Sequence, residues 1–339
     1  MVSLSVSNES ASPADGLRPV NLRTDLAPLA DLIELAFSDS MDSSGRAAVR
    51  EMRTLSRIGP GLNILSGMND LTQGISLGFV WQADNRIVGN VSVYPANWPS
   101  SLGSAWIIAN VATHPDYRGR GIARQLLEAS LAMIQQRGGT TAILQVDAEN
   151  EVAQRLYTRI GFVAERSWTH WRRSATGRVP APGPSGSAYI TQRRRGDWKA
   201  EYALAERVRP ANQGGMGWMR PLHRGLFHKS IWAKLGDWVS LRSMERLVIH
   251  SPDGRHIPAT LWIENAFAAS SVQLTLLVDP DYTGLYDDAL LNLAVRRYGA
   301  RQPISIEHPA DELVSSDLFQ HYLFRPQRTL VHMRWDAWR

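Results

Sequence analysis

The chain has 339 residues, of which 44% are hydrophobic and 20% charged, with no cysteine and a formal net charge of +5 at pH 7. This composition is typical of soluble globular proteins, the length suffices for two ordinary cores, and no stretch approaches the roughly 18 apolar residues of a membrane span. The lack of cysteine excludes disulfides, thiolate metal sites and a cysteine nucleophile, and the small positive excess favours acidic ligands such as nucleotides, phosphates or nucleic acid.

Residues 1–16 lack the basic start and apolar core of a signal peptide, so we expect a disordered tail and a cytoplasmic protein. Further along, apolar spacing predicts helices, and β-rich runs bounded by turn-forming residues predict strands. In chain order we expect a strand at 20–23, helices at 25–37 and 45–56, two strands within 75–95 joined near 83–85, and a strand at 104–115.

The stretch "HPDYRGRGIARQLL" (114–127) places two glycines just before a helix whose apolar residues recur at helical spacing. Glycines at 138–139 end this helix. A strand over 140–147, a helix from Asn150 through Tyr157 and one or two strands within 162–173 follow. Helices that alternate with strands around a mainly antiparallel mixed sheet predict the α+β class.

The glycine-rich stretch has the features of an anion site. The first turn of a helix carries backbone N–H groups without internal partners and the positive end of the helix dipole. Gly119 and Gly121 let a ligand approach the backbone, and Arg118, Arg120 and Arg124 can add charge-assisted hydrogen bonds to phosphate. Neither the Walker pattern nor the dinucleotide fingerprint is present. The stretch therefore predicts a pyrophosphate site of another kind.

The pattern Arg118-x-x-Gly121-x-Ala123 resembles the acetyl-coenzyme A (acetyl-CoA) loop of the GCN5-related N-acetyltransferase (GNAT) family. Residues 150–162, which run from Asn150 through Ala153 and Tyr157 to Gly161-Phe162, resemble the second signature of that family at the expected distance. The resemblance covers about residues 17–173. It implies that this part of the chain binds acetyl-CoA and that no metal is required.

The resemblance also assigns roles by position. Backbone N–H groups of Val111 and Thr113 would hold the acetyl carbonyl and the pantetheine arm, and Asn150 would touch the pantetheine. The cofactor-binding residues implied are Val111, Thr113, Arg118, Gly119, Arg120, Gly121, Ile122, Ala123, Arg124 and Asn150. Tyr157 matches the general acid that protonates the leaving thiolate, and the Val111 N–H, if a bulge splays it outward, would stabilise the tetrahedral oxyanion.

Each assignment has a structural alternative. Tyr157 could be a core aromatic residue, and Asn150 could cap the helix that follows it. The general base is open, because Ile107 stands where part of the family has a glutamate. Asp39, Asp42, Tyr94 or an ordered chain of water molecules could serve instead, and none of them is assigned.

The second half of the chain repeats the layout of the first after a Pro/Gly/Ser-rich linker at 174–188. Pro280-Asp281-Tyr282 echoes Pro115-Asp116-Tyr117, but Thr283 replaces Arg118 and Phe319 replaces Tyr157. Asp287-Asp288 lie where phosphate would bind, and Leu323 replaces Gly161. We therefore expect a catalytic GNAT domain at 17–173 and a degenerate GNAT-like copy at 189–339, a layout that resembles the tandem arrangement of mycothiol synthases and related enzymes.

The resulting expectation is an acyltransferase that moves acetyl from acetyl-CoA to a primary amine of a small molecule or peptide by direct attack in a ternary complex. A non-catalytic acyl-CoA sensor or scaffold module is the alternative. The arginines of residues 166–196 raise nucleic-acid binding as a third possibility, although such runs are usually solvated surface. Some of the 12 tryptophans could line a wall for a cationic amine rather than a core, and the glycine-rich segment 209–225 could be a loop over a cleft or a plain connector.

Overall fold

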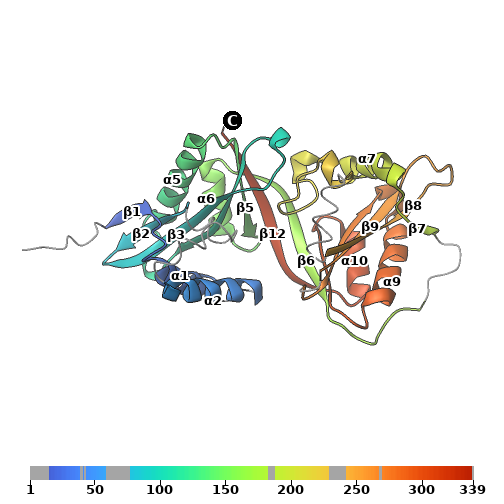
Figure 1. Cartoon of the computed structure of the whole chain (residues 1–339), viewed down its shortest axis with the longest axis horizontal. Helices are drawn as coiled ribbons and strands as arrows, with labels where there is room; N and C mark the ends of the chain where they lie inside the picture. The colour runs from blue at the N-terminus through green and yellow to red at the C-terminus, as the bar shows by residue number, and fades with distance from the viewer. Residues whose placement is uncertain are drawn as a thin grey trace, which may run out of the picture. The chain divides into compact units, whose positions relative to one another are not determined.

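The computed structural model describes residues 15–38, 41, 43–58, 77–181, 188–228, 242–266 and 269–337. The chain divides into two compact units (Figure 1). Unit 1 comprises Met1–Leu144, Val152–Val163 and Arg334–Arg339, and unit 2 comprises Gln145–Glu151 and Ala164–Met333. The tail before residue 15, Asp39, Asp42, linker residues 182–187, Trp232 and Trp238 lie outside the described residues. None of the helices in the described ranges combines the length and apolar character of a membrane crossing.

Unit 1 is built on an antiparallel sheet that ends in one parallel pair. In spatial order its strands are β1 (Gly16–Pro19), β2 (Phe79–Ala83), β3 (Arg86–Pro95), β4 (Ala105–Thr113) and β5 (Thr141–Asp147), with β4 and β5 parallel. Helices α1 (Leu26–Ala36) and α2 (Ser43–Ile58) cover one face, and α5 (Ile122–Gln136) covers the other (Figure 1). Helix α6 (Glu151–Ile160) follows β5. The first strand lies at 16–19, slightly before the expected 20–23.

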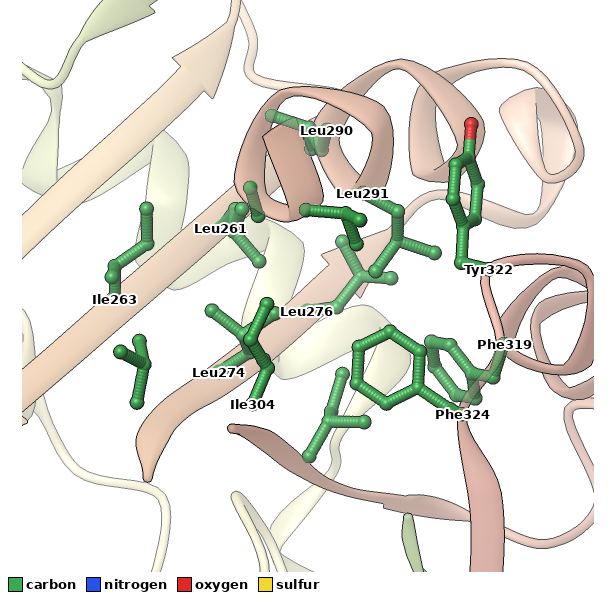
Figure 2. Close-up of a cluster of buried hydrophobic side chains, with 14 of the residues drawn as sticks. Leu261, Ile263, Leu274, Leu276, Leu290, Leu291, Ile304, Phe319, Tyr322 and Phe324 are labelled. Atoms are coloured by element: carbon green, nitrogen blue, oxygen red, sulfur yellow. The ribbon is translucent and has the colours of Figure 1, made fainter. Parts of the chain in front are cut away.

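Unit 2 repeats this plan. Its strand order is β6 (Val163–Arg173), β11 (Ile304–Pro309), β10 (Val272–Val278), β9 (Ala259–Ala266), β8 (Arg242–Ile249) and β7 (Ile190–Gln192), with only β10 and β11 parallel. Helices α9 (Tyr286–Tyr298) and α10 (Leu313–His321) pack on this sheet around Leu274, Leu276, Leu290, Leu291 and Phe319 (Figure 2). Helix α7 (Trp198–Val208) packs on a second cluster around Trp262. The α+β prediction is confirmed.

Three segments, Gln145–Glu151 among them, are counted with a unit other than the one that their place in the sequence suggests. Residues 164–173 of β6 precede the linker, yet Trp168–Arg173 pairs with Ile304–Pro309 of β11 in unit 2. Strand β12 (Arg325–Asp336) ends the chain, yet residues from 334 belong to unit 1, where Ala337 N–H donates to Thr140 O and Thr141 Oγ1 donates to Asp336. These segments belong to the unit whose strands they pair with, rather than to the one nearer in sequence, because backbone N–H and C=O groups at a strand edge need hydrogen-bond partners. The functional division at 174–188 stays a prediction.

Candidate acetyl-CoA site

The last third of β4 contains a β-bulge. Asn90 of β3 pairs with Ala112, but Ser92 pairs with Ala109, so two residues of β4, Asn110 and Val111, lie opposite one residue of β3. Asn110 adopts φ 51°, and its carbonyl accepts a 2.9 Å hydrogen bond from the buried Asn90 amide. Its own amide donates to Ser92 Oγ at 3.2 Å. The bulge on which the role of Val111 depends is therefore present, and it is held by polar side chains of β3.

Strands β4 and β5 separate just before this bulge. Their parallel ladder joins Ala105–Ile107 to Thr141–Ile143 and extends no further along the described strands. The rest of β4 is thus paired on its β3 side alone, and its other edge can hydrogen-bond an extended amide chain such as pantetheine. At the end of β4, the Thr113 hydroxyl is buried and has no hydrogen-bond partner among the described residues. A polar ligand along this edge would supply one.

The loop after β4 leaves backbone N–H groups open to a ligand. Gly119 and Gly121 both adopt φ 76°, and a Cβ built on either glycine would meet no atom within 4 Å. Gly121 is the N-cap of α5, without a side-chain cap and without an acidic residue in the first turn. The N–H groups of Ile122, Ala123 and Arg124 therefore form the unsatisfied first turn of a helix, which is a favourable site for an anion.

The three arginines of the loop differ in the contacts that their side chains already make. Arg120 donates to Asp116 O and stacks over the Tyr117 ring, 4.7 Å from its centroid. Arg124 forms a 2.7 Å ion pair with Glu128 one turn along α5. Arg118 is exposed, and within the described ranges its guanidinium has no hydrogen-bond or ion-pair partner. Arg118 is thus the loop cation most available to a diphosphate.

Tyr157 lies on α6, in the same unit as the loop and the bulge. Its side chain is 6% exposed and contacts Phe162 edge to face, with ring centroids 6.0 Å apart. Burial raises the pKa of the phenol to about 12, so it stays protonated at physiological pH. Asn150 directly precedes α6, donates its N–H to Asp147 O at 3.0 Å, and is counted with unit 2. The structure thus gathers every predicted site residue except Asn150 into unit 1.

The corresponding loop of unit 2 is occupied by its own side chain. Strand β10 pairs with β9 from Gln273 through Val278 without a register shift, so it has no bulge. The carboxylate of Asp287 is fully buried and accepts the N–H of Gly284 at 2.6 Å and of Asp288 at 3.0 Å. Desolvation raises the pKa of this carboxyl group. Asp287 therefore binds the type of backbone donor that stays open in the loop of unit 1.

An ion pair lies between β10 and the start of α10. Arg209 is 2% exposed and donates to Leu276 O of β10 and to both carboxylate oxygens of Glu312. Glu312, the N-cap of α10, stands where Asn150 stands in the first half. Burial opposes its ionisation, but the hydrogen bond to His308 and the charge of Arg209 hold the pKa of Glu312 well below its usual range. Sequence reasoning missed this pair, because nothing in the irregular segment around Arg209 marks it as buried.

Among the described residues near β4 no general base is identified, and Asp39 and Asp42 lie outside the described ranges. Ile107 is fully buried. Tyr94, its ladder partner on β3, has a pKa raised by burial, which disfavours its use as a base at neutral pH. Among the described residues there is no group of three or more His, Cys, Asp or Glu side chains placed to hold a metal ion.

Comparison with known proteins finds similar sequences in the part of the chain that contains the glycine loop. Residues 61–162 match the model of the acetyltransferase (GNAT) family. The N-alpha-acetyltransferase 30 of Schizosaccharomyces pombe is 42% identical over 55 residues, 16% of this chain and 37% of that protein. The mycothiol acetyltransferase of Rhodococcus jostii is 33% identical over 92 residues, 26% of this chain and 29% of that protein. The matches thus span well under half of the length of these relatives.

Two solved structures extend the likeness over nearly the whole chain. A GCN5-related N-acetyltransferase from Sphaerobacter thermophilus aligns with a TM-score of 0.57 at 17% identity, covering 94% of this chain and 95% of its own. A tandem GNAT protein from the clavulanic acid biosynthesis pathway aligns with a TM-score of 0.50 at 15% identity, covering 95% of this chain and 98% of its own. At these identities the likeness shows the fold alone.

Proposed function

We propose that this chain transfers acetyl from acetyl-CoA to a primary amine of a small molecule or peptide, because residues 61–162 match the model of the acetyltransferase (GNAT) family. The observation that carries the proposal is the open loop of unit 1. Its two left-handed glycines and the uncapped N-terminus of α5 follow a bulged strand, and the comparable loop of unit 2 is filled by Asp287.

The residues present fit acetyl-CoA. Arg118 and the backbone N–H groups of residues 119–124 would hold the diphosphate, and the free edge of β4 at Val111 and Thr113 would hold the pantetheine, with Asn150 at its side. The buried Thr113 hydroxyl, which lacks a partner among the described residues, supports this fit, as does the open space at both glycines. The bound coenzyme supplies an activated thioester. The chain supplies orientation and charge stabilisation.

In the proposed reaction the amine nitrogen attacks the thioester carbonyl directly, so a C–N bond forms and the C–S bond breaks. The Val111 N–H at the bulge stabilises the oxyanion. The Tyr157 phenol donates a hydrogen bond to the departing thiolate. With a pKa of about 12 against roughly 8.5 for a thiol, the phenol is the weaker acid, so hydrogen bonding is favoured over complete proton transfer. The group that takes the proton of the amine is not assigned.

We further propose that unit 2 does not bind the coenzyme. The Asp287 carboxylate repels phosphate and already accepts the loop N–H groups. The Arg209–Glu312 pair lies where a pantetheine arm would run beside β10. Isothermal titration with acetyl-CoA is expected to give one site per chain. Two sites, or one site whose affinity is unchanged in Arg118→Ala, would contradict this assignment.

The alternative function is an acyl-CoA sensor that binds the coenzyme without turnover. The specific observation in its favour is Ile107, which leaves the central strand without a carboxylate to act as a base. In this reading the bulge and Tyr157 would serve binding and packing only.

Thiol release from acetyl-CoA, measured with a panel of primary amines, separates the two functions. The transferase predicts amine-dependent release that falls about 10-fold to 100-fold in Tyr157→Phe, the scale of a lost hydrogen bond to a charged group. Tyr189→Phe, at a side chain 84% exposed in unit 2, is the matched control and should act like the native protein. Coenzyme binding without release by any amine would favour the sensor, whereas full activity in Tyr157→Phe would overturn the role proposed for the phenol.

A further inference from the structure

A cluster of aromatic and polar side chains surrounds His332 within unit 2. The Nε2 atom of His332 lies 2.8 Å from the side-chain amide nitrogen of Gln145 and 3.5 Å from Glu307 Oε1. Trp168 stacks on the imidazole with ring centroids 5.7 Å apart, and Trp218 meets it nearly edge on at 5.5 Å. We call these five residues the His332 cluster. They come from β5, β6, β11, β12 and the segment 209–225.

The carboxylate of Glu307 is unusual in this unit. Its side chain is 30% exposed, and its sole ion-pair contact among the described residues is the imidazole at 3.5 Å, beyond a good hydrogen bond. Other partly buried carboxylates of unit 2 are matched by arginine: Glu245 by Arg297, Glu264 by Arg220 and Glu312 by Arg209. Glu307 thus keeps a largely uncompensated charge in a partly desolvated position, which favours a cationic ligand.

The segment 209–225 brings its backbone against the cluster. Gly214 and Gly217 adopt φ 82° and 114°. A Cβ on Gly217 would lie 3.5 Å from Glu307 Oε2 and 3.6 Å from Trp168, and a Cβ on Gly214 would lie 3.3 Å from Glu165 Oε2. Glycine at these positions lets the segment approach closely and set Trp218 beside His332.

The two tryptophans have different environments. Trp168 is 3% exposed, has His332 stacked on its ring, and lies 5.6 Å from the Arg209 guanidinium. Its ring faces are therefore not available to a ligand. Its indole N–H is buried and has no partner within the described ranges. Trp218 is only partly buried, so its ring can contact a ligand. Gln145 is also partly exposed and can accept a hydrogen bond through its side-chain oxygen.

We propose that the His332 cluster binds the amine acceptor as an organic ammonium ion, an inference that rests on the proposed acetyl transfer. The ammonium group donates to the Glu307 carboxylate and the Gln145 side-chain oxygen, and its apolar body lies against Trp218. The substrate class is therefore a primary amine carried on an apolar or aromatic body.

Binding can be measured apart from turnover. Tryptophan fluorescence and calorimetry, both without acetyl-CoA, would follow tryptamine, benzylamine and spermidine, with benzyl alcohol as the uncharged match for benzylamine. We expect an aromatic amine to bind and benzyl alcohol not to bind. Glu307→Gln should weaken amine binding about 10-fold to 100-fold, the range for hydrogen bonds to charged groups. Trp218→Ala should weaken aromatic amines more than spermidine.

The control is Glu245→Gln. Glu245 lies on β8 of the same unit, and its carboxylate is paired with Arg297 of α9. This variant should bind amines like the native chain, and thermal melting would establish that each variant is folded. In the acetyl-transfer assay, Glu307→Gln should raise the KM for the amine and leave the Kd for acetyl-CoA unchanged. The proposal is overturned if folded Glu307→Gln and Trp218→Ala bind amines as tightly as the native chain does. It is also overturned if the native chain binds no amine. Amine binding without turnover supports it and counts against the transferase instead.

Discussion

At the scale of single residues, the loop arginines illustrate how packing assigns roles to identical side chains. Arg118, Arg120 and Arg124 are equivalent in sequence terms, since each can reach a phosphate near the start of α5. In the structure Arg120 stacks on Tyr117 and Arg124 pairs with Glu128, whereas Arg118 has no side-chain partner among the described residues. A guanidinium that gives up no existing contact gains most from a new one.

Arg118→Ala is therefore expected to weaken acetyl-CoA binding about 10-fold, the effect of one charge-assisted hydrogen bond. Arg124→Ala serves as the matched variant and should change the Kd by less than about threefold, because Arg124 already pairs with Glu128 and would have to give up that contact to reach the ligand. Calorimetric titration measures both constants. An equal loss in the two variants would mean that Arg124 leaves Glu128 to bind the ligand.

Tyr157 predicts a particular pH dependence. The phenol must be protonated to donate its hydrogen bond, and burial raises its pKa to about 12 from the usual 10. Deprotonation therefore removes activity only as the pH rises toward 12, and kcat should show no fall assignable to this group between pH 7 and 10. A pH profile of kcat at saturating amine and acetyl-CoA measures this. A decline near pH 8 to 9 that disappears in Tyr157→Phe would show that the phenol ionises early.

At the scale of elements, the bulge of β4 and its absence in β10 separate the two halves. Strand β4 has 9 residues and β10 has 7, and the bulge, in which Asn110 and Val111 oppose one residue of β3, accounts for one of the two additional residues. The sequence repeat indicates equivalent strands, but it does not locate the extra residue of the bulge. The bulge is stabilised across the ladder by Asn90 and Ser92, and such pairing is a long-range property.

Asn90→Ala should lower kcat about 10-fold or more while the protein still binds acetyl-CoA. The change removes the amide that holds Asn110 O, so β4 can relax toward a regular ladder and turn the Val111 N–H away from the oxyanion. Asn292→Ala is the control, because Asn292 is also buried and donates to a backbone carbonyl, that of Ala181 in unit 2. Equal kcat values for the two variants would show that the bulge does not need Asn90.

At the scale of the whole molecule, the sequence predicted the α+β class, the order of the elements and the glycine loop, because these depend on local periodicity and turn residues. It did not predict that residues 164–173 are a strand of unit 2 or that residues 334–339 belong to unit 1. Partners for those strands lie more than a hundred residues away in the chain, and no local pattern encodes them. The Arg209–Glu312 pair was missed for the same reason.

Arg173 is the residue that fixes β6 in unit 2. It is 1% exposed and donates to the carbonyls of Gly299 and Tyr322, at the C-terminal ends of α9 and α10, and also to Arg178 O. Burial lowers the pKa of its guanidinium. Arg173 has no carboxylate partner in the part of the chain that the structure describes, and the negative ends of two helix dipoles stabilise its charge instead. The side chain thus joins a strand from before the linker to two helices from after it.

Arg173→Met should lower the free energy of unfolding by about 3 kcal/mol or more, because several buried carbonyls lose their donor at once. Urea denaturation measures the loss, and Arg255→Met, at an exposed turn position, is the control. Hydrogen exchange should localise the effect: amides of β11, which pair with β6, lose protection, whereas amides of β2 and β3 keep it. Uniform loss of protection across both sheets would mean that the two units unfold as one, and stability equal to that of Arg255→Met would mean that β6 is held by its ladder alone.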